Sequence, residues 1–472
     1  MIWLLAWAAF TRLPYLLSQT LLFGYDHGRD ALAVLQLIKT FNPVFIGPWT
    51  SIPGLFFGPG WYYLLAPAYW LAQGNPLAGP LTMFLLGLIG IVLAYKYLGV
   101  YEAIIMVAAP LWLQLSTVAG NAFPMTLIGL LLVIILKKNR PLLLGLVLGL
   151  GFHFSSALAI FWLLVIPWLV KFKHWLKLAL GILIAFIPQL LFELKHNFSQ
   201  IQAVVSYFTA GESQHINPGK IAIVTQSIIH ELSLAVLPDI FWLKIAGLII
   251  LGIGVIYLIR LKQFAFWPQI LLLTLVPTVG FWFLHYNPWY SYGLLPLAVL
   301  GVSKILRAGP KPLAWLYIIF LIINSGIKIY RFETQDKAIL TQHKGFYQAK
   351  MQALNYIYTQ AGGRPFSSYH YHPEIYDFAY QYLYIWQGFK GKPLPVEFSY
   401  QPGAPTYINE KNALLAMLPP AIGQPETIFL IIEKPENIWH YPFESWLKQI
   451  KFSEIVDKKI IGPELEVWEA IP

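Results

Sequence analysis

The first 330 residues of the chain alternate long apolar runs with short polar connections. Many of the runs reach roughly 17–20 residues, the length that an α-helix needs to cross the hydrocarbon core of a bilayer. The pattern therefore predicts a polytopic all-α membrane protein with about eleven transmembrane helices. The runs lie at about 2–18, 79–95, 98–116, 122–136, 141–157, 158–170, 175–192, 241–259, 265–284, 290–306 and 312–329.

A further apolar run, at about 59–72, is short, rich in aromatic residues and interrupted by Pro67. It fits either a segment that lies along the membrane interface or a true crossing. The charges of the connecting loops bear on this choice, because cytoplasmic loops carry an excess of Lys and Arg.

If 59–72 does not cross and the N-terminus is cytoplasmic, one set of loops is strongly basic. It carries Lys96, Lys137, Lys138, Arg140, Lys171, Lys173, Lys177, Arg260, Lys262, Lys304, Arg307 and Lys311, with Glu102 as its acid. The other set carries Asp26, Asp30, Glu193, Glu212, Glu231 and Asp239. A crossing at 59–72 would instead place the basic loops 137–140 and 171–177 outside. The charges thus favour a cytoplasmic N-terminus and an extracytoplasmic C-terminus.

This topology makes residues 19–78 a long first outer loop of a membrane domain that extends over residues 1–330. Within the loop, the stretch Arg29–Phe41 has an apolar face typical of an interfacial helix. The members of that face are Ala31, Leu32, Leu35 and Ile38.

From about residue 331 the chain becomes polar and mixed, which indicates a second, extracytoplasmic domain over residues 331–472. Residues 349–360 and 444–450 have helical patterns, and residues 427–432 and 465–470 have strand patterns. A small α/β or α+β domain accounts for this alternation.

Composition agrees with a membrane protein, since 57% of the residues are hydrophobic and the mean hydropathy is +0.60. The net charge of +10 is interpreted as a topology signal rather than as a nucleic-acid-binding surface. The chain has no cysteine, which excludes disulfides, thiolate metal sites and a cysteine nucleophile. The first segment contains Arg12 and Pro14 and lacks a small-residue cleavage site, so we expect a retained helix.

Polar residues gather at the predicted outer ends of the helices. The densest group is Phe23-Gly24-Tyr25-Asp26-His27-Gly28-Arg29-Asp30, and other polar groups near the outer helix ends are Ser116, Asn121, His153, Ser155, Ser156, Glu193, Lys195, His196, His285 and Tyr290. Their common side favours a site facing one side of the membrane. Interfacial solvation of the charges is the alternative.

Each of these residues also has a structural interpretation. His153 fits a hydrogen bond between two helices, and Glu193 and Lys195 fit interfacial anchors. Arg12 fits a polar packing network within the helices. The aromatic residues Trp61, Tyr62 and Tyr63 fit an interface belt.

Signatures of soluble enzymes are absent from the sequence, which has no P-loop, no His-Glu-x-x-His and no Gly-x-Ser-x-Gly. A membrane enzyme without a nucleotide site is suited to a lipid-carried substrate, such as a sugar on a polyprenyl phosphate. Its chemistry needs a carboxylate base for the acceptor and cations for the departing phosphate. Asp26 is the candidate base, and Arg29, Lys195 and the histidines are candidate phosphate partners.

The order of these elements resembles the GT-C membrane glycosyltransferases of the glycosyltransferase family 39 type, which include protein O-mannosyltransferases and the aminoarabinose transferase of lipid A. The resemblance covers roughly residues 1–330. It depends on Tyr25-Asp26-His27-Gly28-Arg29-Asp30-Ala31, on Gly54-Leu55-Phe56-Phe57-Gly58-Pro59 followed by Trp61-Tyr62-Tyr63, and on Phe192-Glu193-Leu194-Lys195-His196-Asn197-Phe198.

The resemblance implies an inverting transfer from a polyprenyl-phosphate sugar, with Asp26 as the base. Two motifs depart from the family pattern. His27 stands where the family commonly has Glu after the Asp, which weakens any inference of metal binding through that Glu. Phe56-Phe57-Gly58-Pro59 replaces a Phe-Glu-Lys-Pro element, so the phosphate contact comes from elsewhere or the donor differs.

The leading hypothesis is a multi-pass glycosyltransferase of a prokaryotic plasma membrane, acting on a lipid, glycan or protein acceptor outside the cell. Asp26 activates the acceptor, and His27 or Asp30 holds Asp26 or binds a divalent metal. The expected substrate contacts are Arg29, Asp30, His153, Glu193, Lys195, His196, His285 and Tyr290. The alternatives are a flippase for lipid-linked sugars and a non-catalytic membrane assembly protein.

Overall fold

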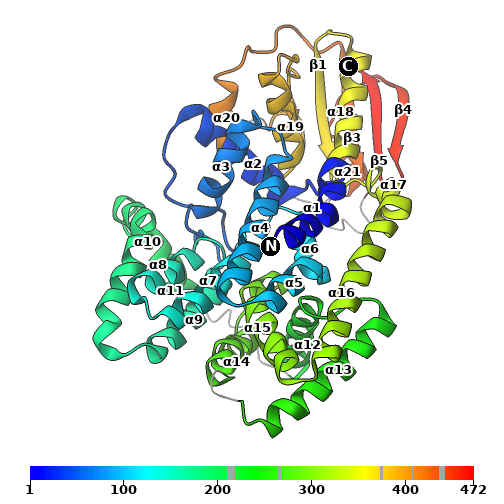
Figure 1. Ribbon diagram of the computed structural model, residues 1–472. Helices are drawn as coiled ribbons and strands as arrows, with labels where there is room; N and C mark the ends of the chain where they lie inside the picture. The colour runs from blue at the N-terminus through cyan, green and yellow to red at the C-terminus, as the bar shows by residue number, and fades with distance from the viewer. Residues whose placement is uncertain (210–217, 264–266, 373–375, 405–407, 435–441) are drawn as a thin grey trace. The chain divides into compact units, whose positions relative to one another are not determined.

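The structure of the chain is a computed structural model that describes residues 1–209, 218–263, 267–372, 376–404, 408–434 and 442–472 (Figure 1). Glu212, expected on the outer face, lies outside these residues. The described chain divides into two compact units. The helical unit comprises Met1–Leu13, Val44–Leu64 and Thr82–Tyr330, and the mixed unit comprises Pro14–Pro43, Leu65–Leu81 and Arg331–Pro472.

The helical unit ends at Tyr330, and the tail from Arg331 belongs to the mixed unit. The division into domains at residue 330 stays a prediction. The mixed unit, however, includes two N-terminal segments that the sequence analysis assigned to the membrane domain. These segments, 14–43 and 65–81, group with the tail rather than with the helices that precede and follow them. The acidic motif at residues 23–30 therefore belongs to the same unit as the tail.

Helices make up most of the chain up to Arg331. Their bounds are α1 (Ile2–Leu17), α2 (Tyr25–Thr40), α3 (Gly60–Leu71), α4 (Ala78–Tyr97), α5 (Val100–Ala108), α6 (Pro110–Leu115), α7 (Met125–Lys138), α8 (Pro141–Gly151), α9 (Ser156–Leu169), η1 (Phe172–His174), α10 (Trp175–Lys195), α11 (Ser199–Thr209), α12 (Pro218–Leu234), α13 (Phe241–Arg260), α14 (Trp267–Phe283), η2 (Pro288–Leu294), α15 (Leu295–Ala308) and α16 (Lys311–Arg331).

Each apolar run predicted from the sequence contains a helix in the structure. Two runs are interrupted: residues 98–116 form α5 and α6, and residues 290–306 begin as the 3-10 helix η2 before α15. The sequence analysis did not predict the helices α11 and α12, which lie between the apolar runs at 175–192 and 241–259. The run at 59–72 is the short helix α3.

Five of the described helical segments have the length and composition of a membrane crossing. They are Ala78–Tyr97, Phe172–Lys195, Phe241–Arg260, Pro288–Ala308 and Lys311–Leu340. Four shorter apolar helices accompany them: Ile2–Leu17, Pro141–Gly151, Ser156–Leu169 and Trp267–Phe283. The chain is therefore a mostly helical protein with several apolar helices, as predicted, and the count of about eleven crossings stays a prediction.

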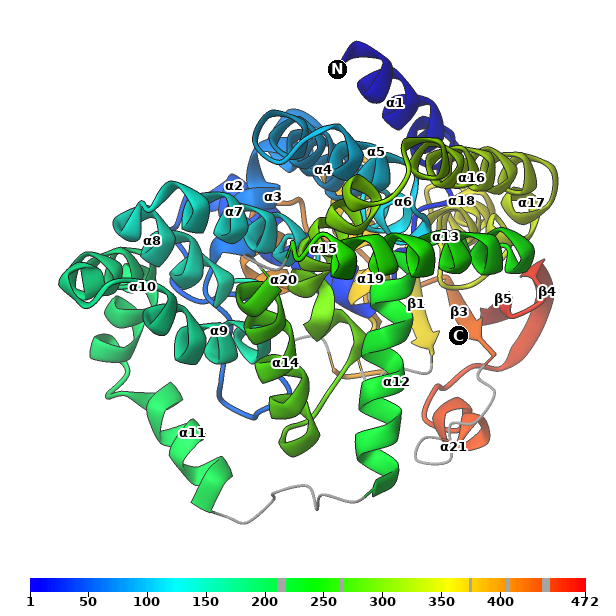
Figure 2. The same cartoon turned by 60° about the horizontal axis from the view of Figure 1, so that its bottom comes forward.

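Glycines bring α8 and α10 into close contact, and Figure 2 shows these helices side by side with α9. A Cβ atom at Gly145 would lie 2.0 Å from the carbonyl oxygen of Leu178, and one at Gly181 would lie 2.2 Å from that of Leu142. Small residues at a helix interface allow such backbone contact, which maximises van der Waals packing between apolar helices.

The mixed unit is built on a five-stranded sheet with the order β2-β1-β3-β5-β4. Strands β1 (Phe366–Tyr371), β2 (Phe398–Ser399) and β3 (Thr427–Glu433) are parallel, whereas β5 (Leu465–Ile471) is antiparallel to both β3 and β4 (Glu454–Gly462). Helix α18 (Tyr347–Ala361) packs against β3, β4 and β5. The remaining tail helices are α17 (Lys337–Leu340), α19 (Phe378–Phe389), α20 (Asn409–Leu415) and α21 (Phe443–Leu447).

Four tail elements confirm predictions from the sequence, namely α18, β3, α21 and β5. The predicted end before Gly362-Gly363 is also confirmed, because Gly362 caps α18 with a φ of +57°. The sequence analysis missed β1 and α19. Strand β1 is buried throughout, but its sequence is Phe-Ser-Ser-Tyr-His-Tyr. Because this sequence lacks the apolar run that marks a buried strand, the sequence analysis did not predict it.

Helix α2 confirms the predicted amphipathic stretch, but a protein surface covers its apolar face. Ala31, Leu32 and Leu35 are at most 1% exposed, and α2 packs against α19 within the mixed unit. The prediction of an interfacial helix is therefore wrong for this face. An apolar stripe buries equally well against a protein helix and against a membrane, so periodicity does not separate the two.

One face of the sheet is lined by buried polar side chains. Glu433 of β3 accepts hydrogen bonds from Lys350 of α18 and from the hydroxyl of Tyr380 of α19. Burial alone would raise the pKa of Glu433, but Lys350 and its other partners outweigh burial and hold that pKa below its usual value. Burial lowers the pKa of His372 to about 4, although Asp377 and Glu433 act in the opposite direction.

We expect Gly145→Ala to separate α8 from α10 and to cost about 1–3 kcal/mol, because its methyl group would overlap the Leu178 carbonyl. Thermal unfolding of the purified protein in detergent measures the effect. Gly252→Ala is the matched control, because a Cβ at this helical glycine of α13 meets no atom within 4 Å. Equal unfolding temperatures for the two variants would contradict the close contact.

We expect the mixed unit to lose stability as the pH falls from about 6.5 to about 4. In this pH window His372 is protonated in the unfolded chain and neutral in the folded chain. The difference lowers the free energy of unfolding by up to about 3 kcal/mol. Limited proteolysis of the tail at about pH 7 and about pH 4.5 measures the loss. His372→Gln should show a smaller loss, and an identical loss in both proteins would refute the assignment to His372.

Candidate functional site

The acidic motif forms the first turns of α2, in the mixed unit. Gly24 is the N-cap of this helix, and its backbone N–H lies 3.4 Å from Nδ1 of His27, which reaches back from the N3 position. The backbone N–H of Gly28 donates to the carbonyl oxygen of Gly24 at 3.0 Å, so the helix starts at Tyr25 and carries Asp26, Arg29 and Asp30 in its first two turns.

Arg29 holds the two carboxylates of the motif together. Its Nη1 lies 2.7 Å from Oδ1 of Asp26, and its Nη2 lies 2.8 Å from Oδ1 of Asp30. The side chains of Arg29 and Asp30 are only 10% and 7% exposed, whereas that of Asp26 is 65% exposed. The geometry thus presents one accessible carboxylate, Asp26, on a buried cationic support.

Helix α19 of the tail supports the start of α2 within the mixed unit. A Cβ atom at Gly28 would lie 2.4 Å from the backbone nitrogen of Ala379, so only glycine allows this approach. The ring of Tyr25 meets that of Phe378 edge-on with centroids 4.9 Å apart. The position of Asp26 therefore depends on a tail helix that the sequence analysis did not predict.

The residues before α19 contain a Ser–His–Asp series. His370 donates from Nδ1 to Asp377, and its Nε2 lies 3.1 Å from Oγ of Ser368. Tyr384 donates to the same Oγ at 2.8 Å, and Gln381 donates to Asp377 at 2.8 Å. The hydrogen bonds connect serine to histidine and histidine to aspartate, as they do in the catalytic triad of a hydrolase.

Burial argues against catalysis by this series. Ser368, His370 and Asp377 are each at most 2% exposed, so a substrate has no access to the serine. Asp377 is also the N-cap residue of α19. We interpret the series as a buried network that fixes the start of α19 and, through it, the packing of α2.

His153 is placed in the helical unit, where both of its ring nitrogens are engaged. The backbone N–H of Gly60 donates to Nδ1 at 3.0 Å, and Nε2 lies 2.9 Å from the carbonyl oxygen of Ala185, to which it donates. A Cβ atom at Gly58 would lie 2.5 Å from the same ring. His153 therefore connects the segment before α3 to α10, which agrees with its structural interpretation.

Glu193 is engaged in a similar way at the start of α11. Its carboxylate is buried and accepts from the backbone N–H groups of Gln200 and Ile201 at 3.2 and 3.3 Å. The side chain of Gln200 in turn accepts from the backbone N–H of Phe56 at 2.9 Å. Glu193 thus caps a helix whose second residue anchors the Phe56-Phe57-Gly58-Pro59 element.

The other predicted contacts of the helical unit are more accessible. Lys195 and His196 are exposed, and His196 stacks on Phe192 with ring centroids 4.0 Å apart. In the turn after α14, the amide of Asn287 lies 3.3 Å from Nε2 of His285 and 3.5 Å from the hydroxyl of Tyr290. Lys195, His196 and His285 are exposed and keep a surface available for a ligand, whereas Tyr290 is buried.

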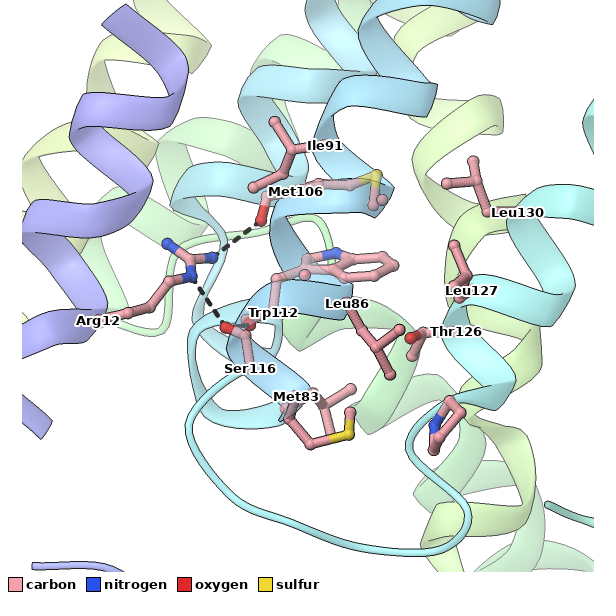
Figure 3. Close-up of a pocket in the computed structure, with 14 residues that line it drawn as sticks. Arg12, Met83, Leu86, Ile91, Met106, Trp112, Ser116, Thr126, Leu127 and Leu130 are labelled. Atoms are coloured by element: carbon pink, nitrogen blue, oxygen red, sulfur yellow. Dashed lines mark hydrogen bonds between the residues drawn. The ribbon is translucent and has the colours of Figure 1, made fainter. Parts of the chain in front are cut away.

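Arg12 is fully buried beside a small cavity between α1, α4, α6 and α7 (Figure 3). Its guanidinium donates to Oγ of Ser116 at 2.8 Å and to the carbonyl oxygens of Val107 and Met106 at 2.9 and 3.2 Å. Pro110 has no N–H, so the Met106 carbonyl lacks its normal helical donor, and Arg12 replaces it. The predicted polar packing network around Arg12 is confirmed.

The predicted site residues thus fall into two groups, one in each unit. Asp26, His27, Arg29 and Asp30 come together in the mixed unit. The predicted contacts of the helical unit are His153, Glu193, Lys195, His196, His285 and Tyr290. Among the described residues, no group of three or more His, Asp or Glu side chains has the geometry to hold a metal ion, and a metal at His27 stays a prediction.

No protein-family profile matches the chain, and no curated protein matches it significantly. Solved structures do resemble it. ArnT from Cupriavidus metallidurans bound to undecaprenyl phosphate aligns with a TM-score of 0.60 and 12% identity, over 99% of this chain and 98% of that one. The same protein in the apo state aligns with a TM-score of 0.59 and 13% identity, over 99% and 97%. The chain therefore has the fold of the GT-C membrane glycosyltransferases.

Proposed function

We propose that the chain is a membrane glycosyltransferase that transfers a sugar from a polyprenyl-phosphate-linked donor to an acceptor on the extracytoplasmic face. The observation that carries this proposal is the exposed Asp26 carboxylate, held by the buried Arg29. The fold adds support, because the similar ArnT structure contains undecaprenyl phosphate. Transferred sugars of the hexosyl and pentosyl classes both fit the proposal, as do lipid, glycan and protein acceptors.

In the proposed reaction, Asp26 is the general base. It takes a proton from a hydroxyl or amino group of the acceptor while that group attacks the anomeric carbon. The bond between the anomeric carbon and the phosphate oxygen breaks, and polyprenyl phosphate leaves with the bonding electrons. Attack from the face opposite the phosphate inverts the configuration of that carbon.

The contacts of Arg29 support a positioning role rather than a phosphate contact. Its guanidinium already bonds to Asp26 and Asp30, and the Arg29 side chain is largely buried. Lys195 and His196 of the helical unit are exposed and stay the predicted phosphate contacts. His153 and Glu193 anchor the segment 44–64 within the helical unit.

The proposed location is the plasma membrane of a prokaryote, with a cytoplasmic N-terminus and an extracytoplasmic tail. The apolar helices support a multi-pass protein, and the basic and acidic loops support this orientation. An extracytoplasmic Asp26 would then meet lipid-linked donors after they have crossed the membrane.

We expect Asp26→Asn to lower sugar transfer by about 10²-fold or more, because an amide cannot take the acceptor proton. Transfer of a radiolabelled sugar from a polyprenyl-phosphate donor measures the loss. Asp336→Asn is the control, since it replaces another exposed aspartate of the mixed unit. Full activity of correctly folded Asp26→Asn protein would remove Asp26 from the base role.

The parent protein in the same assay separates the proposal from its rivals. Bond formation to an acceptor supports the glycosyltransferase. Movement of the lipid-linked sugar across vesicles without bond formation would favour a flippase, and neither outcome would favour an assembly protein.

We expect Gly28→Ala to lower transfer by about tenfold or more, because its methyl group would push α2 away from Ala379 and displace Asp26 from its productive position. The same transfer assay measures the effect, together with the unfolding temperature. Gly24→Ser is the matched control, because a Cβ at Gly24 meets no atom within 4 Å and serine is a favourable N-cap. Unchanged transfer by Gly28→Ala would show that contact with α19 does not position Asp26.

A further inference from the structure

Five basic side chains come together in the helical unit at the ends of three helices. Lys96 lies at the end of α4, Lys137 and Lys138 at the end of α7, and Lys304 and Arg307 near the end of α15. Helix α15 packs against both α5 and α7. We refer to these five residues as the basic cluster.

A buried ion pair organises the basic cluster. Glu102 of α5 is fully buried and accepts from Nη1 of Arg307 at 2.8 Å and from Oγ of Ser303 at 2.6 Å. Gly99 makes room for this pair, since a Cβ atom there would lie 2.6 Å from Nη2 of Arg307. The side chain of Arg307 is 38% exposed, so the pair links the interior to the surface.

Lys137 and Lys304 are close enough to act on one another. Lys137 interacts electrostatically with Glu102 and Arg307, and Lys304 interacts with Lys137 and Arg307. Five bases against the one acid Glu102 give the cluster a net charge of +4. Holding like charges together costs free energy, which an anion bound among them would recover.

Aromatic rings accompany the basic cluster. Nζ of Lys138 lies 3.7 Å from the ring centroid of Tyr97, and Nζ of Lys96 lies 5.4 Å from the same centroid. The guanidinium carbon of Arg307 lies 5.6 Å from the ring centroid of Tyr101. Tyrosines and bases at the ends of apolar helices are typical of the depth of lipid headgroups.

We propose that the basic cluster binds the headgroup of an anionic phospholipid. The phosphodiester would lie among Lys137, Lys138 and Lys304, and hydroxyl groups of the headgroup would lie beside Tyr97. A lipid fits better than a soluble anion, because the cluster is at the ends of apolar helices, where acyl chains and headgroup reach it together. The inference is independent of the transfer reaction, because none of these residues takes part in the proposed chemistry.

A second basic segment offers a matched control. Lys171, Lys173 and Lys177 lie on or beside η1 and the start of α10, are exposed, and are accompanied by the aromatic residues Phe172 and Trp175. The positive-inside rule places them on the same side of the membrane as the basic cluster. These three lysines follow one another along one stretch of chain. The residues of the basic cluster, in contrast, come from separate helices around the buried carboxylate of Glu102.

The test compares two triple variants of the full chain, purified in detergent. One is Lys137→Gln with Lys138→Gln and Lys304→Gln, and the other is Lys171→Gln with Lys173→Gln and Lys177→Gln. Binding of short-chain phosphatidylglycerol is titrated by microscale thermophoresis, with phosphatidylcholine and inorganic phosphate as further ligands. Glu102 and Arg307 are left unchanged, and unfolding temperatures confirm that both variants are folded.

We expect the first variant to weaken phosphatidylglycerol binding by about 10²-fold, since each of its three lysines contributes about fivefold. The second variant should weaken binding by no more than about twofold. Phosphatidylcholine should bind weakly to all three proteins, and inorganic phosphate should not displace phosphatidylglycerol. Equal weakening by the two variants would show that binding depends on surface charge in general and not on the basic cluster, which would overturn the proposal. Displacement by inorganic phosphate, or equal binding of the two lipids, would overturn it as well.

Discussion

The helical unit depends on one constraint, which is that polar backbone groups among apolar helices need a hydrogen-bond partner from the protein itself. Arg12 meets this need at the break before Pro110, and His153 meets it at Gly60. Glu193 and Gln200 meet it for the start of α11 and for Phe56. Polar side chains within an apolar sequence therefore often serve as hydrogen-bond partners of backbone N–H and carbonyl groups.

The acidic motif differs from these residues in what its side chains contact. Arg29 bonds to the carboxylates of Asp26 and Asp30, and Asp26 remains exposed. Asp26 stabilises the first turn of α2 and pairs with Arg29, but its carboxylate is also 65% exposed. This accessibility, more than the density of charge in the motif, is the reason for proposing Asp26 as the base.

The tail contributes to the acidic motif through packing rather than through chemistry. Gly28 touches the backbone of α19, and the buried His370–Asp377 pair fixes the first turn of that helix. Polar networks of this kind specify one arrangement of a core, because each member loses free energy if its partner moves. The sheet and the acidic motif therefore belong to one compact unit, although hundreds of residues separate them along the chain.

The sequence by itself determined the helices of the long apolar runs, because such runs and their period are local properties that survive in any arrangement. It also identified the strands β3 and β5, the acidic motif and the polar environment of Arg12. It did not predict α11, α12 or α19. Only the tertiary structure decided which polar side chains form hydrogen bonds with backbone groups, as His153 and Glu193 do. It alone decided that α2 lies against α19 and that β1 is a buried strand, because both depend on partners far away in the chain. Local patterns state which face of an element is apolar, and tertiary contacts decide what covers that face.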